Sequence, residues 1–283
     1  MIDLHCHSTC SDGTCSPEEL AEMGRGFSVF AITDHDNCDG GARFLEASRG
    51  QSGVRLAGIE LSLESDEGYG EFHMLGLGID TADEGMARFL EDIRRGRDDR
   101  NERMVAKLCE LGMPLTMEEV VAVSGGEVIA RPHVASAMMK RGYVGSIAEA
   151  FAKVIGPGCP AYCSRFHPRP EAAIAAIHAA GGVAVMAHPR SWTRDPSMLR
   201  SGLAKLKDAG LDGIEAVYQA NTPDETIDHL RAAKELGLAV SAGSDFHGRH
   251  KPTITLGMNV EREDEFIAPL LARLEEVRKG LGR

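Results

Sequence analysis

The feature that most constrains the fold is an alternation of short apolar segments with helical segments along most of the chain. Apolar segments of strand length occur at residues 2–5, 29–33, 54–63, 72–79, 183–187, 213–217 and 239–242. Helical patterns separate most of them, and Ser16 followed by Pro17 marks one helix start. Strands that alternate with helices predict βαβ units and therefore a parallel sheet or barrel.

The middle of the chain departs from this alternation. From about residue 83 to residue 152 the pattern is helical, charged and poor in strands. A proline- and glycine-bearing segment at residues 156–160 is consistent with a return hinge. We therefore expect one part built from residues 1–82 and 157–283, and a helical insertion at residues 83–156.

Composition and charge restrict the functional class. The net charge of −12 over 283 residues disfavours a surface that coats nucleic acid, so no stable DNA binding is expected. The seven cysteines are odd in number and do not suggest a disulfide framework. The chain has no apolar run near the length of roughly 20 residues that a membrane helix needs, and it starts without a secretory signal. We expect a cytoplasmic protein without a membrane partner.

Histidines and carboxylates follow the expected strands or lie within them. In a strand, alternate side chains share a face, so His5 and His7 point together while Cys6 faces the other way. The candidate metal ligands are His5, His7, Asp12, His35, Glu60, His73, His188, Asp245 and His247. Parallel β/α folds collect functional groups at the carboxyl ends of their strands, so these side chains are expected to converge. Any one of the histidines alone is equally well explained as a hydrogen-bonded or exposed residue.

This set is larger than one ion can use, so two or three divalent ions are expected. A mixture of imidazole and carboxylate ligands suits Mn, with Zn or Fe as alternatives. Ions about 3.5 to 4 Å apart hold a bridging hydroxide and clamp the phosphoryl oxygens during in-line attack. The ligand set therefore indicates phosphoester hydrolysis.

The order of these motifs resembles that of the PHP (polymerase and histidinol phosphatase) superfamily. The motifs are His5-x-His7-x4-Asp12-Gly13, Thr33-Asp34-His35, Gly58-x-Glu60, His73, Ala187-His188-Pro189 and Gly243-Ser244-Asp245-x-His247. The resemblance implies an α/β fold, a distorted (β/α)7 barrel of PHP type with a helical insertion subdomain. It also implies three ion sites: one at His5, His7, Glu60 and Asp245, a second at Glu60, His73 and His188, and a third at Asp12, His35 and His247.

Two motifs in the insertion resemble substrate-facing motifs of the short PHP phosphatases, namely the 3′,5′-nucleoside bisphosphate phosphatases and their ribonuclease relatives. The motifs are Arg97-Asp98-Asp99-Arg100-Asn101 and Arg131-Pro132-His133. The resemblance implies removal of the 3′-phosphate from a small nucleotide such as 3′-phosphoadenosine 5′-phosphate. Arg131 and then Arg100 are the candidates for the second phosphate, because arginine donates paired hydrogen bonds to phosphate. Asn101 is a candidate for ribose or base binding, with a solvent-facing position as the alternative, and His133 is a candidate for proton donation or a phosphate hydrogen bond.

Three other functions remain open at this stage. The same site would serve a 5′→3′ exoribonuclease acting on short RNA. A histidinol-phosphate phosphatase would need an acidic pocket group for its cationic substrate. A non-catalytic, metal-stabilised module that binds a partner protein would keep the ligands without cleaving a phosphoester. No glycine-rich motif for a nicotinamide cofactor or ATP occurs.

Overall fold

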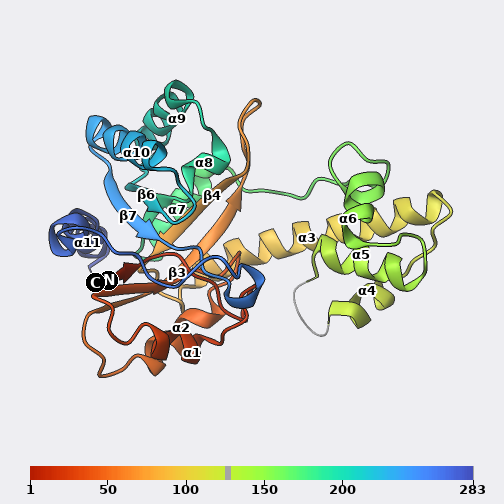
Figure 1. Cartoon of the computed structure of the whole chain (residues 1–283), viewed down its shortest axis with the longest axis horizontal. Helices are drawn as coiled ribbons and strands as arrows, with labels where there is room; N and C mark the ends of the chain where they lie inside the picture. The colour runs from red at the N-terminus through yellow and green to blue at the C-terminus, as the bar shows by residue number, and fades with distance from the viewer. Residues whose placement is uncertain (125–128, 283) are drawn as a thin grey trace. The chain divides into compact units, whose positions relative to one another are not determined.

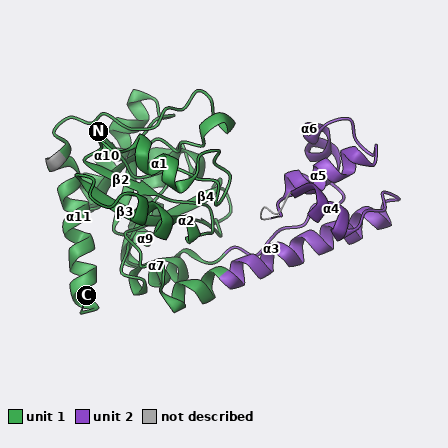
Figure 2. Cartoon of the chain, turned by 90° about the horizontal axis from the view of Figure 1, so that it is seen from below, with its two compact units in different colours: residues 1–90, 168–283 green, residues 91–167 purple. Residues whose placement is uncertain are grey.

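The chain forms two compact units in a computed structural model that describes residues 1–124 and 129–282, apart from the side chain of residue 264. The first unit contains residues 1–90 and 168–283, and the second contains residues 91–167 (Figure 2). Both boundaries fall later than the expected 82/83 and 156/157. The first one shifts because helix α3 (Glu84–Glu110) begins in unit 1 and runs on without a break into unit 2.

Unit 1 is built around a seven-stranded sheet in which each strand pairs with the next along the chain. The strands are β1 (Ile2–Asp3), β2 (Val29–Ile32), β3 (Val54–Leu63), β4 (Phe72–Leu77), β5 (Val183–Met186), β6 (Gly213–Tyr218) and β7 (Ala239–Gly243). The first and last strands also approach each other, because the backbone N–H of Leu4 donates to the carbonyl of Ala242 at 2.9 Å. The sheet is thus a nearly closed, distorted seven-stranded barrel, which confirms the expected fold class.

Strand β4 runs against its neighbours, and here the expectation of a wholly parallel sheet is wrong. It pairs antiparallel with β3, with Ser62 opposite His73, and antiparallel with β5, with Met74 opposite Met186. The linker between β3 and β4 covers only residues 64–71, which is too short for the crossover that a parallel pair requires. The reversal brings the amino end of β4, and with it His73, to the edge where the neighbouring strands have their carboxyl ends.

Helices surround this sheet, and local sequence signals explain where several of them begin. They are α1 (Pro17–Met23), α2 (Asp39–Ala47), α7 (Pro170–Ala179), α8 (Pro189–Trp192), α9 (Pro196–Asp208), α10 (Pro223–Leu236), the short 3-10 helix η2 (Gly248–His250) and α11 (Glu263–Gly280). Ser16 caps α1 together with Glu19 in a reciprocal capping box. In Figure 1, α9 and α10 lie side by side, and α10 packs on β6.

The two faces of the first strands contribute to different apolar cores. Val29 and Ala31 of β2 pack with α11, whereas Phe30 and Ile32 pack with α1 and Phe44 of α2. This alternation follows from the two-residue period of a strand. Because both faces of these strands pack against apolar residues, polar residues are left to the loops at the carboxyl ends of the strands.

Unit 2 has a core of its own and no strand among its described residues. Its helices are the later part of α3, α4 (Met117–Ser124), α5 (Arg131–Lys140), α6 (Ile147–Ala150) and the π-helical turn η1 (Phe151–Ile155). Met104, Leu108 and Val134 are among the fully buried residues of this core. Over the described part of the whole chain, no helix combines the length and apolarity that crossing a membrane requires.

Candidate metal centre

The first two candidate ligands follow β1 and lie in the interior. His5 and His7 are fully buried, and their Nε2 atoms are 3.1 Å apart. Between them, Cys6 faces the opposite side, where its thiol donates to the carbonyl of Ala31. This distance is that of a hydrogen bond between the two rings, and it also brings both nitrogens within reach of a single cation.

Glu60, on β3, occupies the middle of the site and is fully buried. Its Oε1 lies 2.8 Å from Nε2 of His188 and 2.9 Å from Nδ1 of His73. Its Oε2 lies 2.9 Å from Nδ1 of His35, 3.2 Å from Nε2 of His7 and 3.3 Å from Nε2 of His5. Yet Oε2 has no hydrogen bond of acceptable geometry from the described residues. A buried carboxylate oxygen that faces three ring nitrogens without a hydrogen bond fits coordination of a divalent cation.

Asp245 and His247 come from the loop after β7. Asp245 Oδ1 lies 3.3 Å from His7 Nε2 and 3.3 Å from His247 Nδ1. Its Oδ2 accepts hydrogen bonds from the Tyr218 hydroxyl at 3.0 Å and from Lys251 Nζ at 2.7 Å. The backbone of Asp245 has a φ of 59°, in the left-handed region that few residues other than glycine adopt. Strained backbone of this kind is concentrated at functional sites.

Asp12 lies on the open side of the group, with its side chain 56% exposed. One of its oxygens is 3.2 Å from His247 Nε2, and the other is 3.8 Å from His35 Nε2. Asp12 is therefore the candidate ligand that solvent or a substrate reaches most easily.

All nine candidate ligands of the sequence belong to one connected cluster. They form four overlapping groups whose ligand atoms lie within 4.8 Å of one another: His7, Asp12, His35 and His247; His5, His7 and Asp245; His5, Glu60 and His188; and His35, Glu60 and His73. The grouping differs in part from the one that the family resemblance implies, because His188 groups with His5 and Glu60 while His73 groups with His35 and Glu60. The assignment of ligands to individual ions stays a prediction.

The electrostatics of the cluster keep its carboxylates ionised. Burial alone would raise the pKa of Glu60, but His35, His5 and His73 hold it well below its usual range. Burial likewise opposes the ionised form of Asp245, and His5 and His7 lower its pKa in spite of this. In the other direction, burial would lower the pKa of His35, but Glu60 and Asp12 raise it to about 9. A cation that binds here meets ionised oxygens and must displace protons from imidazoles.

Two buried carboxylates that support the cluster were not among the residues predicted from the sequence. Glu215 of β6 contacts His5 and the backbone of His188, and Asp3 of β1 accepts hydrogen bonds from Ser244 and Gly257. Burial raises the pKa of Asp3 to about 6. A signal existed for both, since each acid stands inside an otherwise apolar strand, where an unpartnered carboxylate is unfavourable.

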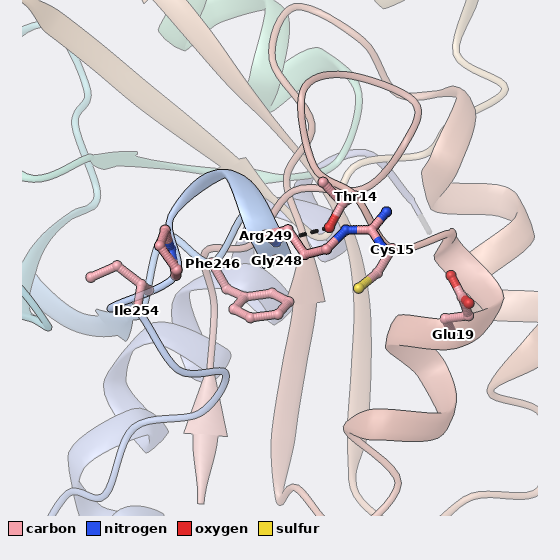
Figure 3. A pocket seen from close by; sticks show the side chains of 8 residues that line it. Thr14, Cys15, Glu19, Phe246, Gly248, Arg249 and Ile254 are labelled. Atoms are coloured by element: carbon pink, nitrogen blue, oxygen red, sulfur yellow. Dashed lines mark hydrogen bonds between the residues drawn. The ribbon is translucent and has the colours of Figure 1, made fainter.

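A pocket lies next to the loops that carry Asp12 and His247. Figure 3 shows its lining, which comes from the loop after β1, from α1 and from the segment after β7. The lining residues are Thr14, Cys15, Glu19, Phe246, Gly248, Arg249, Pro252 and Ile254, and none of the nine candidate ligands is among them. Phe246 also belongs to the apolar core around α1.

The candidate substrate residues lie in unit 2, and a positively charged group forms there. Arg100 is only 5% exposed, and burial followed by the charges of Arg131, Arg165 and Arg97 lowers its pKa to about 10. The Arg131 guanidinium lies 5.6 Å from the centre of the Phe151 ring, at cation–π distance.

The two other candidates of unit 2 have clear local roles. Asn101 is fully buried; its Oδ1 accepts from Arg100 Nε at 2.9 Å and its Nδ2 donates to the carbonyl of Ile129 at 3.1 Å. Its amide thus holds Arg100 in place, and the expected contact of Asn101 with ribose or base stays a prediction. His133 Nδ1 accepts from the backbone N–H of Ala130 at 3.1 Å, so the ring proton is on Nε2.

Comparisons with known proteins agree with this fold and site. The sequence profile of the PHP domain family matches residues 3–105. A 5′-3′ exoribonuclease of Haemophilus influenzae is 35% identical over 94% of this chain and 96% of its own length. A 3′,5′-nucleoside bisphosphate phosphatase of Chromobacterium violaceum is 34% identical over 87% of each chain. A solved structure from Bifidobacterium adolescentis, with the provisional description of a metal-dependent phosphoesterase, has 33% identity and a TM-score of 0.76 over 96% of each chain.

The barrel with its connected histidine and carboxylate cluster is that of a metal-dependent phosphoesterase. The chain belongs to the PHP domain family.

Proposed function

We propose that this protein hydrolyses the 3′-phosphate of 3′,5′-nucleoside bisphosphates, such as 3′-phosphoadenosine 5′-phosphate, and leaves the 5′-monophosphate. The observation that carries the proposal is the convergence of five histidines on the two oxygens of Glu60. The donor set suits two or three divalent ions, with manganese as our first choice and zinc or iron as alternatives. A cytoplasmic location is part of the proposal, because all seven cysteines are free, as in a reducing compartment.

The proposed ligands are the nine residues of the cluster. Glu60 would bridge ions, because its two oxygens face different sets of histidines. The outer group of Asp12, His35 and His247 would hold a third ion, which would make the centre trinuclear. Divalent ions at these ligands would supply the Lewis acidity that activates water and stabilises negative charge on the phosphoryl oxygens.

The chain's own residues contribute orientation and charge. Tyr218 and Lys251 both donate to Oδ2 of Asp245, which leaves Oδ1 directed at the histidines. Lys251 is 41% exposed and adds a positive charge at the rim, where an anionic substrate approaches.

Substrate selection is assigned to unit 2. A second phosphate that is not at the ions needs cations of its own, and the group around Arg100 and Arg131 offers them. Asn101 would hold Arg100 in place, as its two hydrogen bonds within unit 2 support. We propose His133 as a phosphate ligand through its Nε2–H group, or, when the ring is protonated on both nitrogens, as the acid that protonates the leaving oxygen and becomes neutral imidazole.

A phosphate-release assay tests the substrate. The purified protein, loaded with Mn²⁺, is supplied with nucleosides that carry a 3′-phosphate, a 5′-phosphate or both. The proposal expects the highest kcat/KM for the bisphosphate, with the 5′-monophosphate as product. Equal rates on all three nucleotides would contradict it.

Variants of α5 test the role of unit 2. Arg131→Ala should lower kcat/KM for the bisphosphate by about 10²-fold or more, which corresponds to the loss of a charged hydrogen bond pair, and should spare a simple aryl phosphate. The matched control is Arg141→Ala at the end of the same helix, where Arg141 pairs with Glu119 on the surface. The control should leave both rates unchanged.

A 5′→3′ exoribonuclease activity on short RNA is the second candidate. It is favoured by the match to a relative that is named for this activity and that covers nearly the whole chain. Release of mononucleotides from a 5′-phosphorylated oligomer, faster than phosphate release from the bisphosphate, would make it the principal function.

Two further alternatives are disfavoured by particular residues. A histidinol-phosphate phosphatase binds a cationic amine, for which the arginine group of unit 2 is unsuited. A non-catalytic, metal-stabilised module has no need of the solvent-accessible Asp12 beside a complete ligand cluster.

A further inference from the structure

Glu215 lies beside the cluster, but it is not one of the nine candidate ligands. It stands on β6 and is fully buried. Its Oε1 accepts a hydrogen bond from Nδ1 of His5 at 3.0 Å, and its Oε2 accepts one from the backbone N–H of His188 at 2.7 Å. One carboxylate on β6 thus connects the segments that follow β1 and β5.

The contact with His5 decides which ring nitrogen faces the cluster. A carboxylate at Nδ1 keeps the ring proton on that atom, because an ionised carboxylate only accepts hydrogen bonds. The lone pair of Nε2 is then directed at the cluster, where Glu60 Oε2 lies at 3.3 Å and Asp245 Oδ1 at 3.6 Å. Histidine ligands of metals are commonly oriented in this way by a carboxylate behind them.

The contact with His188 fixes a strained backbone. His188 has a φ of 23° and a ψ of 68°, although it is not a glycine. Such conformations are strained and persist only where the surroundings hold them. Glu215 Oε2 holds the N–H of this residue, whose Nε2 in turn lies 2.8 Å from Glu60.

The neighbouring strand is shaped to admit the Glu215 side chain. A Cβ atom at Gly243 would lie 2.3 Å from Glu215 Oε1 and 2.4 Å from the Cβ of His5, so any larger residue would push the carboxylate and the ring apart. The pairing of β6 with β7 also shifts register between Glu215 and Val217. A bulge at such a place re-aims a side chain.

We infer that Glu215 is a positioning residue of the metal centre, which sets the tautomer of His5 and the backbone of His188 and thereby the affinity for the ions. The inference rests on the proposed metal-dependent function. It predicts that loss of this carboxylate weakens metal binding even though Glu215 is not one of the nine candidate ligands.

The test compares two buried acids with matched surroundings. Glu215→Gln keeps the size of the side chain, but a glutamine offers one acceptor oxygen to two donors. The control is Asp212→Asn just before the start of β6, where Asp212 also accepts from a histidine ring, that of His178, and from a backbone N–H, that of Ala184. Mn²⁺ affinity is measured by competition with a chelator, and thermal unfolding is recorded for both metal-free variants.

We expect Glu215→Gln to lower the Mn²⁺ affinity by about 10- to 100-fold and Asp212→Asn to leave it unchanged, while both lower the melting temperature. Unchanged affinity in Glu215→Gln, with normal metal uptake and phosphate release by the wild type, would overturn the inference and leave the proposed function standing. Absence of metal uptake by the wild type would overturn both.

A measurement on the wild-type protein covers the case in which Glu215→Gln does not fold. Nitrogen-15 NMR of the zinc-loaded protein, with its diamagnetic ion, reports the tautomer of each histidine. The inference requires a proton on Nδ1 of His5, and a proton on Nε2 would refute it. Gly243→Ala is the second variant: it keeps the carboxylate but displaces it from His5, and it should weaken Mn²⁺ binding in the same range.

Discussion

Asp212 provides the sharpest test of how the barrel is held at the end opposite the metal centre. Its side chain is almost completely buried and accepts three hydrogen bonds, from His178 Nε2 at 2.7 Å, Arg273 Nε at 2.7 Å and the N–H of Ala184 at 2.8 Å. The carboxylate thereby ties α7, β5 and α11 to the start of β6. Asp212→Asn removes the charge while the shape of the side chain is retained.

The loss in the free energy of unfolding that Asp212→Asn should cause can be worked out from these contacts. An asparagine oxygen in place of Oδ2 retains the bonds to His178 and Ala184 but loses the one to Arg273, which is 43% exposed and therefore counts for less. The two retained bonds change from charged to neutral, and each loses about 1 kcal/mol. We expect a total loss of about 2–4 kcal/mol in the free energy of unfolding of unit 1. For a unit of roughly 200 residues, this lowers the melting temperature by roughly 5–15 °C.

The loss of stability in Asp212→Asn should be largest near neutral pH and smaller in acid. Burial opposes ionisation of Asp212, but the hydrogen bonds from His178 and Arg273 lower its pKa below the unfolded value of about 4. A depressed carboxylate pKa contributes stability that is present above the unfolded pKa and is lost as the pH falls through the folded pKa.

The assay is urea unfolding of metal-free wild type and Asp212→Asn from about pH 7 down to about pH 3. The difference between the two proteins should be constant from about pH 7 to about pH 5 and should shrink in more acidic solution. A difference that is absent at neutral pH, or that grows on acidification, would refute the reasoning.

Three other predictions concern the cluster. Glu60→Gln should reduce Mn²⁺ content and phosphate release by about 10²-fold or more, because the negative charge of Glu60 faces five imidazoles. Metal analysis checks this, and the exposed Glu67→Gln is the control that should behave as wild type. Removal of metal with a chelator should lower the free energy of unfolding by about 3–4 kcal/mol relative to protein held at 100 to 1,000 times the Kd, and equal melting curves would argue against a filled centre. Apparent Mn²⁺ affinity should rise between about pH 6 and pH 9, because the pKa of His35 is raised to about 9 and its proton must leave before the metal binds. Calorimetry in buffers of different ionisation enthalpy would detect the released proton. An affinity that falls as the pH rises is incompatible with this prediction.

The sequence predicts most of the barrel because its strands are short, apolar and well separated. β3 has the expected bounds of residues 54–63, and the others differ by one or two residues at their ends. The direction of β4 was missed, because direction depends on the length of the linker rather than on the strand itself. The convergence of the nine candidate ligands was predictable, because strand topology brings their loops to one edge.

The supporting residues were harder to predict. Glu215 and Asp3 are distant in sequence from the motifs that identify the site, and their partners are a ring nitrogen and backbone groups that only the folded chain brings together. Asn101 was expected to bind ribose or base, or to face solvent, because its motif resembles a substrate-facing motif of the family. Its burial, which depends on packing within unit 2, excludes the solvent-facing position, and its side chain accepts a hydrogen bond from Arg100. Burial of single polar residues in helices is not encoded in a local pattern.

Anomalous scattering at the manganese edge, from crystals grown with Mn²⁺, tests the central claim most directly. The account predicts two or three anomalous peaks among the side chains around Glu60, with His5, His188 and Asp245 in contact with them. Crystals of an active preparation without a peak at this cluster, or with peaks only elsewhere on the protein, would contradict it.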